Sequence, residues 1–148
     1  MTTATFSKAL SANDVGATGG HQGGILVPKT EAELLSFFPA LEPAVKNPDA
    51  WVICEDEERK RWKFRFVYYN NKLHDQNGTR NEYRITYMTK YFRELCAREG
   101  DSLEISKDAE SEIYFIRLRR ANKAHELGPK EEADGVRIKL KSGWSRVH

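Results

Sequence analysis

The sequence contains no long apolar run, and this absence excludes a helical membrane protein. No window of its 148 residues approaches the roughly 20 consecutive apolar residues that a membrane-spanning helix needs. The opening residues, MTTATFSKAL, also lack the basic and then apolar pattern of a secretory signal. We therefore expect no membrane partner, a cytoplasmic location, and a short flexible lead-in at the N-terminus.

Cysteine is scarce as well. The chain has two cysteines, Cys54 and Cys96, and their positions are far from the CxxC spacing of a redox or metal motif. Both stand among apolar residues, which is the usual setting of a buried free thiol in a reducing compartment. We expect two buried thiols, with neither a disulfide nor a metal site.

The chain also lacks a strong charge of either sign, because its formal net charge is +2. Composition alone therefore does not mark it as a nucleic-acid-binding protein. A basic stretch, 59–65, directly follows the acidic run Glu55–Glu58. Salt screens charges beyond about 10 Å, so such a stretch can still attract phosphates locally. A solvated surface with internal charge pairs explains the same pattern equally well.

Length and patterning predict one mostly β domain over residues 1–148, of the α+β class. A capping-box spacing, with Thr30 as N-cap and Glu33, predicts a short helix that ends at Pro39. A second short helix is expected from near Thr89 to before Gly100. Short apolar or alternating runs, typical of a barrel or sandwich, predict strands at 25–27, 51–54, 62–69, 103–105, 112–119 and 136–140.

The run WKFRFVYY at 62–69 is the clearest of these strands. Its aromatic residues alternate with Lys63 and Arg65, and successive side chains of a strand point to opposite faces. We expect the aromatic face to pack in the core and both cations to point outward together.

A second alternation occupies Thr79–Arg84, where Arg80, Glu82 and Arg84 would share one side of an extended segment. Arginine donates two hydrogen bonds to guanine, and glutamate accepts one from the amino group of cytosine, so this set suits C·G pairs. Asn81 would face the other way. From spacing alone, an ordinary solvated strand with an internal Arg–Glu pair is the more common origin of such a pattern.

The Gly-rich stretch Val15–Gly24 must form an irregular loop, because five glycines in ten residues disfavour helix and strand. A phosphate cradle, a catalytic loop and a DNA-reading arm are the alternatives. No lysine follows the glycines, so the pattern of a nucleotide-binding P-loop is missing. His21 could act as a general base, but no nearby serine or cysteine has a supporting partner.

A loose nuclease motif gives the competing enzymatic hypothesis. Asp49, Glu58 and Lys60 follow the order of two carboxylates and a lysine that position Mg²⁺ and water in some nucleases. Matches of this kind arise easily by chance. The alternative function is therefore a small Mg²⁺-dependent nuclease.

Two motifs together carry a family resemblance. The stretch SANDVGATGGHQGG at Ser11–Gly24 and TRNEYRIT at Thr79–Thr86 closely resemble the N-terminal effector domain of EcoRII-type restriction endonucleases, up to about Gly100. The resemblance implies a DNA-binding pseudobarrel, the fold of plant B-three transcription-factor domains, whose two arms enter the major groove from opposite sides. It implies a monomer that binds one double-stranded CCWGG-type site in a prokaryotic cell. The domain itself would need no cofactor and have no catalytic residues, and a covalently linked nuclease domain would use Mg²⁺.

The resemblance also assigns residues. The N-arm would be Ser11–Gln22 and the C-arm Thr79–Arg84, with Arg65 at a further DNA-contacting position beside the outward Lys63. Gly78 and Tyr83 stand where the family carries lysines, which should weaken phosphate contacts. The complete set of expected DNA-binding residues is Ser11, Asn13, Asp14, His21, Gln22, Lys63, Arg65, Thr79, Arg80, Asn81, Glu82 and Arg84.

Overall fold

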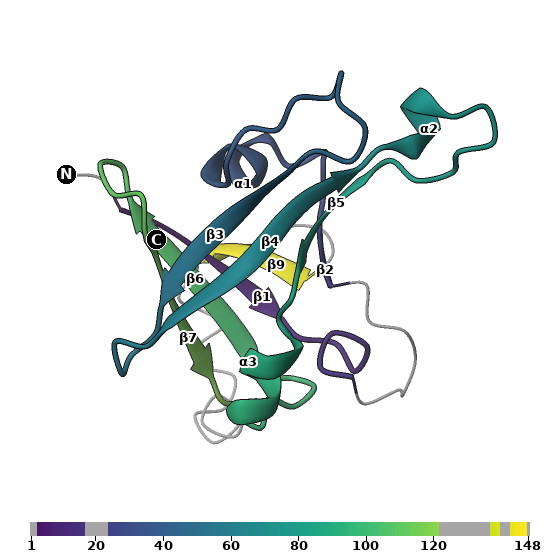
Figure 1. Ribbon diagram of the computed structural model, residues 1–148. Coiled ribbons are helices and arrows are strands. Elements are labelled where there is room, and N and C mark those ends of the chain that lie inside the picture. The colour runs from purple at the N-terminus through teal and green to yellow at the C-terminus, as the bar shows by residue number, and fades with distance from the viewer. Residues whose placement is uncertain (1–2, 17–23, 122–136, 140–142, 148) are drawn as a thin grey trace.

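A single curved sheet forms the body of the computed structural model, which describes residues 3–16, 24–121, 137–139 and 143–147 (Figure 1). In these segments nine strands lie in the order β2-β5-β4-β3-β7-β6-β1-β9-β8. Their bounds are β1 Thr3–Ala9, β2 Ile25–Val27, β3 Asp49–Glu55, β4 Arg61–Tyr69, β5 Glu82–Thr86, β6 Ser102–Asp108, β7 Tyr114–Arg119, β8 Arg137–Lys139 and β9 Trp144–Val147. The pairings are antiparallel except for a short parallel contact between β3 and β7. The strands expected from sequence are present with shifted ends.

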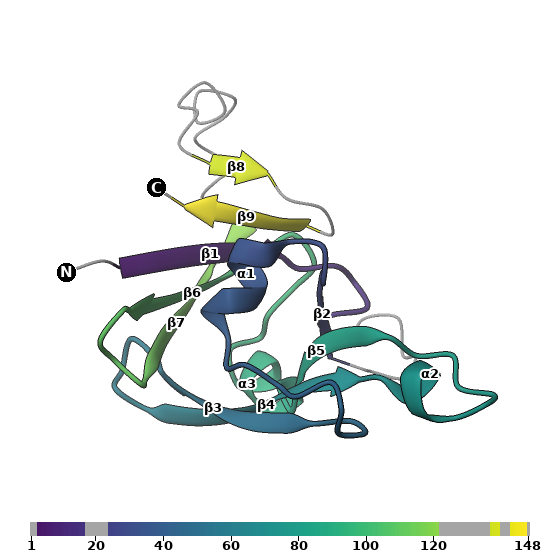
Figure 2. The same ribbon diagram turned by 90° about the horizontal axis from the view of Figure 1, so that it is seen from above.

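A tryptophan joins β2, the first strand of the sheet, to β9, the strand next to the other end. Trp144 of β9 is fully buried, and its indole Nε1–H donates a hydrogen bond of 2.8 Å to the carbonyl oxygen of Leu26 in β2. The sheet therefore closes on itself without a continuous backbone ladder at this seam. Figure 2 shows β1 and β9 on one side, β3 and β4 on the other, and helix α1 (Ala32–Phe37) across the opening between them.

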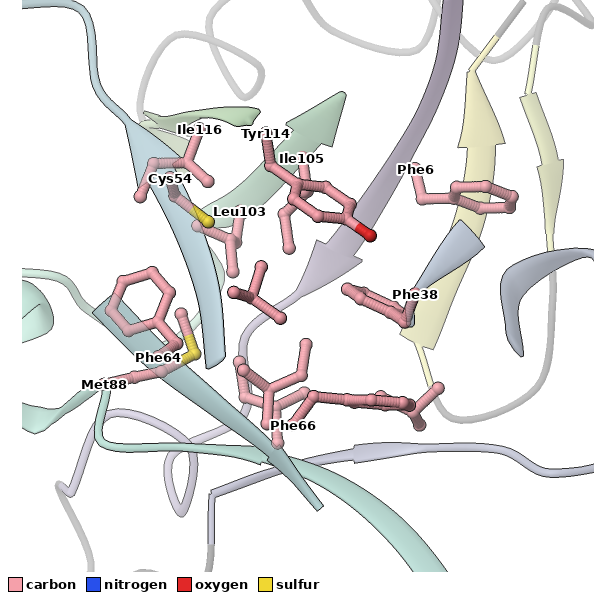
Figure 3. Packing of buried hydrophobic residues seen from close by; sticks show 14 of the residues in the cluster. Phe6, Phe38, Cys54, Phe64, Phe66, Met88, Leu103, Ile105, Tyr114 and Ile116 are labelled. Atoms are coloured by element: carbon pink, nitrogen blue, oxygen red, sulfur yellow. The ribbon is translucent and has the colours of Figure 1, made fainter. Parts of the chain in front are cut away.

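The alternation in β4 is confirmed. Phe64 and Phe66 are about 1% exposed, whereas Lys63 between them points to solvent. Phe38, just after α1, stacks on Phe66 with ring centroids 4.9 Å apart, and the hydroxyl of Tyr114 donates to a backbone carbonyl of α1. Figure 3 shows Phe38, Phe66 and Tyr114 meeting in the core. Aromatic packing thus fixes α1 over one end of the barrel.

Three short helices are present among the described residues, where two were expected. The additional one is α2 (Asn71–His74), a single turn inside a segment that reads as a loop because of its turn-forming residues. Helix α3 (Thr89–Glu94) ends earlier than expected, since Cys96 takes a left-handed conformation with φ 51°. The described helices are all too short to cross a membrane.

Three local expectations are wrong. The N-terminal residues are not a lead-in, because β1 pairs with β6 on one side and β9 on the other. The capping box is absent: Glu31 is the N-cap of α1, no side chain caps the helix, and Glu33 forms an ion pair with Arg146 of β9 instead. Cys54 is buried, which raises the pKa of its thiol to about 12, but Cys96 is exposed beyond the end of α3.

Replacement of Trp144 by phenylalanine should lower the free energy of unfolding by about 1–3 kcal/mol. The carbonyl of Leu26 would lose its donor, and the smaller ring would leave a void. Urea denaturation measures the change. Trp51→Phe is the matched control, because Trp51 is 44% exposed, and its cost should stay within about 0.5 kcal/mol. Equal losses in the two variants would contradict the role of the seam.

Candidate nucleic-acid interface

The strands β3, β4 and β5 carry several charged and polar side chains on the outside of the barrel, and the buried residues Val67 and Thr86 lie among them. In the β4–β5 register, Phe66 pairs with Ile85, and both are buried. The neighbouring positions therefore point outward, since strand side chains alternate. These positions pair Arg65 with Thr86, Val67 with Arg84 and Tyr69 with Glu82. We call this surface the outer face of β3–β5.

The expected Arg80, Glu82 and Arg84 array is confirmed as one cluster at the start of β5. Arg80 Nη2 lies 3.5 Å from Glu82 Oε2, and Arg84 Nε donates a hydrogen bond to the same oxygen. The guanidinium of Arg80 also lies over the ring of Tyr69, 3.8 Å from its centroid. The internal Arg–Glu pairing left open by the sequence is therefore real, and it arranges donors and an acceptor in one row.

Glu82 is held in its charged form. Partial burial opposes ionisation, but the hydrogen bond from Arg84 and the positive charges of Arg84 and Arg80 outweigh it. The pKa of the Glu82 carboxyl therefore lies below its ordinary value. Both arginines contact Oε2 of Glu82, so its Oε1 takes no part in these two pairs. A carboxylate oxygen can accept a hydrogen bond from an amino group.

Arg84 joins the C-arm to the end of the Gly-rich loop. Its Nη1 donates to the carbonyl oxygen of Gly24 at 3.0 Å. Gly24 has φ +87°, and a Cβ there would meet the carbonyl oxygen of Ile85 at 2.3 Å, so only glycine fits so close to β5. Arg84 is thus more committed to intramolecular contacts than Arg80, whose side chain is 40% exposed.

The opposite side of the C-arm is built on aromatic stacking. Tyr83 and Tyr68 stack with centroids 4.1 Å apart, and the Tyr68 hydroxyl donates a hydrogen bond to Asn81 Oδ1. Asn81 and Tyr83 therefore face away from the arginine row, as expected, and Asn81 positions the arm. Thr79 is exposed beside them.

Helix α2 forms hydrogen bonds with the backbone of the C-arm. Asn71 Oδ1 accepts a hydrogen bond of 2.8 Å from the backbone N–H of Arg80, and the N–H of Lys72 donates to the carbonyl of Arg80. Gly78 lies so close to α2 that a Cβ would stand 2.1 Å from the carbonyl oxygen of Asn71. This contact gives a physical reason for glycine at position 78.

A buried asparagine locks the root of this arm. Asn70 is fully buried, its Nδ2 donates to the carbonyls of Pro43 and Val45, and its Oδ1 accepts from the N–H of Asn47. In return, Asn47 Oδ1 accepts a hydrogen bond from the Asn70 backbone N–H. Because Asn70 is buried, loss of any of these side-chain hydrogen bonds would leave a polar group without a partner and lower the stability of the fold.

The described part of the N-arm is a tight turn. Asp14 Oδ2 accepts from the Ser11 backbone N–H, and Ser11 Oγ accepts from the Asp14 N–H. The same carboxylate oxygen is 3.0 Å from Lys8 Nζ, in an ion pair whose side chains are 8% and 10% exposed. Ser11 and Asp14 therefore shape the arm, whereas Asn13 is exposed on it. His21 and Gln22 lie outside the described residues.

Two of the cations of β4, Lys63 and Arg65, differ in their partners. Arg65 Nε lies 2.6 Å from Asp49 Oδ2, and this hydrogen bond raises the pKa of the guanidinium. Lys63 Nζ instead lies over the ring of Trp51, 4.9 Å from its centroid. Sequence reasoning missed Asp49, Trp51 and Tyr69 as members of this face, because only the strand register places them beside Arg65 and Arg80.

The nuclease alternative is wrong in its geometry. Asp49 begins β3, whereas Glu58 lies in the turn after β3 ends, so the strand separates them by about 20 Å. Asp49 is paired with Arg65, and Lys60 with Glu94 at 2.9 Å. Within the described segments, no three His, Cys, Asp or Glu side chains are placed to hold a metal ion.

Lys8→Met should destabilise the fold by about 3–5 kcal/mol, because it leaves the nearly buried Asp14 carboxylate without its cation. The double variant Lys8→Met/Asp14→Asn should recover most of this loss, since the amide still accepts from Ser11. Chemical denaturation of the two variants provides the measurement. A double variant no better than the single one would show that charge pairing does not hold the arm.

Glu82 should contribute to the acid sensitivity of the fold. Its folded-state pKa lies below the ordinary 4.5, so its stabilisation is complete above the unfolded-state pKa and is lost as pH falls through the folded-state pKa. Glu82→Gln should therefore show a smaller loss of stability than the wild type on acidification below 4.5. Denaturation at several pH values tests this, and identical pH profiles would contradict the pairing.

Sequence comparison with known proteins relates this chain to a restriction endonuclease and to plant proteins. The family model described as restriction endonuclease EcoRII, N-terminal, matches residues 1–106. The type II restriction enzyme EcoRII of Escherichia coli is 39% identical over 89 residues, which are 55% of this chain and 20% of the enzyme. Auxin response factor 7 of Arabidopsis thaliana is 30% identical over 121 residues, or 80% of this chain and 9% of that protein.

A rice protein and a solved structure extend the comparison. A B3 domain-containing protein of Oryza sativa subsp. japonica is 29% identical over 126 residues, covering 83% of this chain and 59% of that protein. The structure of the Arabidopsis FUS3–DNA complex has a TM-score of 0.57 and 24% identity, and covers 78% of this chain and 95% of that chain. The chain thus spans a fifth or less of EcoRII and of the auxin response factor. The fold is the mostly β pseudobarrel of B3 domains, and the chain belongs to the family of EcoRII restriction endonuclease N-terminal domains.

Proposed function

We propose that this domain binds double-stranded DNA and reads a short site from the major groove with its two arms. The observation that carries the proposal is the Arg80–Glu82–Arg84 row on the outer face of β5, in a chain of the EcoRII N-terminal family. The B3 structure with the same fold is a complex with DNA, which supports the same mode of binding.

The C-arm supplies the chemistry for C·G pairs. The guanidinium of Arg80 lies over the ring of Tyr69, and an arginine can donate two hydrogen bonds to guanine. Glu82 is ionised and can accept from the amino group of cytosine. Arg84 would join the readout by exchanging its contact with Gly24 for a base.

The N-arm would enter the groove from the opposite side. The described part of the N-arm, residues 11–16, and the C-arm both lie on the right in Figure 1. Asn13 is exposed at the described part of this arm, and His21 and Gln22 complete the set expected to contact bases. Before DNA binds, the Arg84–Gly24 hydrogen bond links the C-arm to the end of the Gly-rich stretch.

The domain would act as the targeting and effector part of a restriction endonuclease and perform no chemistry of its own. The proposed site is of the CCWGG type, bound by one monomer in a prokaryotic cytoplasm. Cleavage would belong to a covalently linked nuclease domain with Mg²⁺. The short share of EcoRII that the chain covers is consistent with a targeting domain attached to a larger enzyme.

Fluorescence anisotropy with labelled duplexes tests this function. We expect tighter binding to a duplex with CCWGG than to a scrambled one, and Arg80→Ala or Glu82→Ala should each weaken binding to the site by about 1–3 kcal/mol and relax the choice of base. Arg146→Ala removes a similar arginine–glutamate pair far from the arms and serves as the control.

Two results would contradict the proposal. Equal affinity of the wild type for both duplexes at moderate salt would exclude sequence-specific recognition. Loss of affinity in Arg146→Ala as large as in Arg80→Ala would show that the effect is not confined to the C-arm.

A further inference from the structure

An exposed aromatic pair lies on the outer face of β3–β5, beyond the residues assigned to base reading. Trp51 is 44% exposed and Tyr87 66% exposed, and their rings meet edge to face with centroids 5.2 Å apart. Trp51 stands opposite Arg65 in the β3–β4 register, and opposed residues point to the same face. The pair is therefore continuous with the candidate interface.

The backbone holds Tyr87 on this face at an energetic cost. Its φ is 69°, in the left-handed region that bulky residues rarely adopt, and it directly follows the last residue of β5. Such strained residues persist where the surrounding structure requires them, and they are concentrated at functional sites. Here the strain accompanies an exposed ring at the side of Trp51.

Lys63 gives the pair a positive charge. Its Nζ lies 4.9 Å from the centroid of the Trp51 ring, and among the described residues it has no carboxylate within ion-pair distance. The neighbouring cations on β4 are paired, Arg65 with Asp49 and Arg61 with Glu55. The uncompensated charge of the cluster thus belongs to Lys63.

The spacing along β4 places this cluster at the edge of a major groove. Arg84 stands opposite Val67, four residues from Lys63, which is about 13 Å along a strand. The groove is about 12 Å wide. When Arg84 reaches a base in the groove, Lys63 and Trp51 would stand where the sugar–phosphate backbone lies.

We propose that Trp51, Lys63 and Tyr87 form a contact for the DNA backbone outside the base pairs that the arms read. Lys63 would pair with a phosphate, the Tyr87 hydroxyl would donate to a phosphate, and the Trp51 ring would pack on deoxyribose. This inference rests on the proposed function and adds a contact that fixes the position of the domain without reading sequence.

The test uses the intact chain and two duplexes that share one CCWGG site. One duplex has normal flanks, and the other carries neutral methylphosphonates in the flanks. Wild type should bind the neutral duplex about three- to tenfold more weakly, and Trp51→Ala and Lys63→Gln should bind both duplexes at about that weaker level. The salt dependence of Lys63→Gln should fall by about one phosphate contact.

Two further variants separate a DNA contact from a structural role. Tyr87→Gly removes the ring and relieves the left-handed strain, so its thermal midpoint should not fall although its affinity for the normal duplex does. Phe115→Ala is the matched control, because Phe115 is 43% exposed on β7, where it stands opposite Glu55 at the last residue of β3, about 13 Å along that strand from Trp51, and should bind like wild type.

The outcomes distinguish the two proposals. Wild type that binds no duplex overturns the proposed function and this inference together. Wild type that prefers CCWGG but is indifferent to neutral flanks, with Trp51→Ala equal to it, overturns this inference alone. A loss confined to single-stranded DNA in Trp51→Ala would also overturn it, because it would make the aromatic pair a base-stacking surface.

Discussion

The hydrogen bond from Trp144 to Leu26 is the constraint on which the arrangement of the arms depends. Strand β2 is three residues long and pairs with β5 along one edge only, so its other edge is held by the Trp144 indole. The Gly-rich loop returns to the barrel at this strand. The pairing with β5 and the seam together hold β2 in place, and Gly24, directly before β2, accepts from Arg84.

Most charged side chains of the candidate interface already have partners within the protein. Glu82 is bound by two arginines, Arg65 by Asp49, and Arg80 lies on Tyr69. DNA binding would therefore exchange internal hydrogen bonds for new ones, and its net free energy is smaller than the new contacts suggest. The same internal pairs hold the side chains in place, which reduces the conformational entropy lost on binding.

Sequence patterns predicted the features that depend on local periodicity. The alternation in β4 gave its inner and outer faces, and the spacing of Arg80, Glu82 and Arg84 gave their shared side. The short motifs of the two arms gave the family. Each of these can be read within a few residues, because a strand has a repeat of two.

Features set by distant partners could not be predicted in this way. β1 was missed because a buried Lys8 in a strand is expected only if Asp14 and two flanking strands are known. Asp49 fits the alternative nuclease motif in sequence, because its partner, Arg65, is revealed only by the β3–β4 register. The seam joins residues more than a hundred positions apart.

The position of the seam has a consequence for where this domain can be cut. The family match ends at residue 106, inside β6. The core also takes Tyr114 and Ile116 from β7, and Trp144 from β9, all of them beyond that point. A fragment that stopped with the recognisable family sequence would keep both arms and lose the strands that close the barrel behind them.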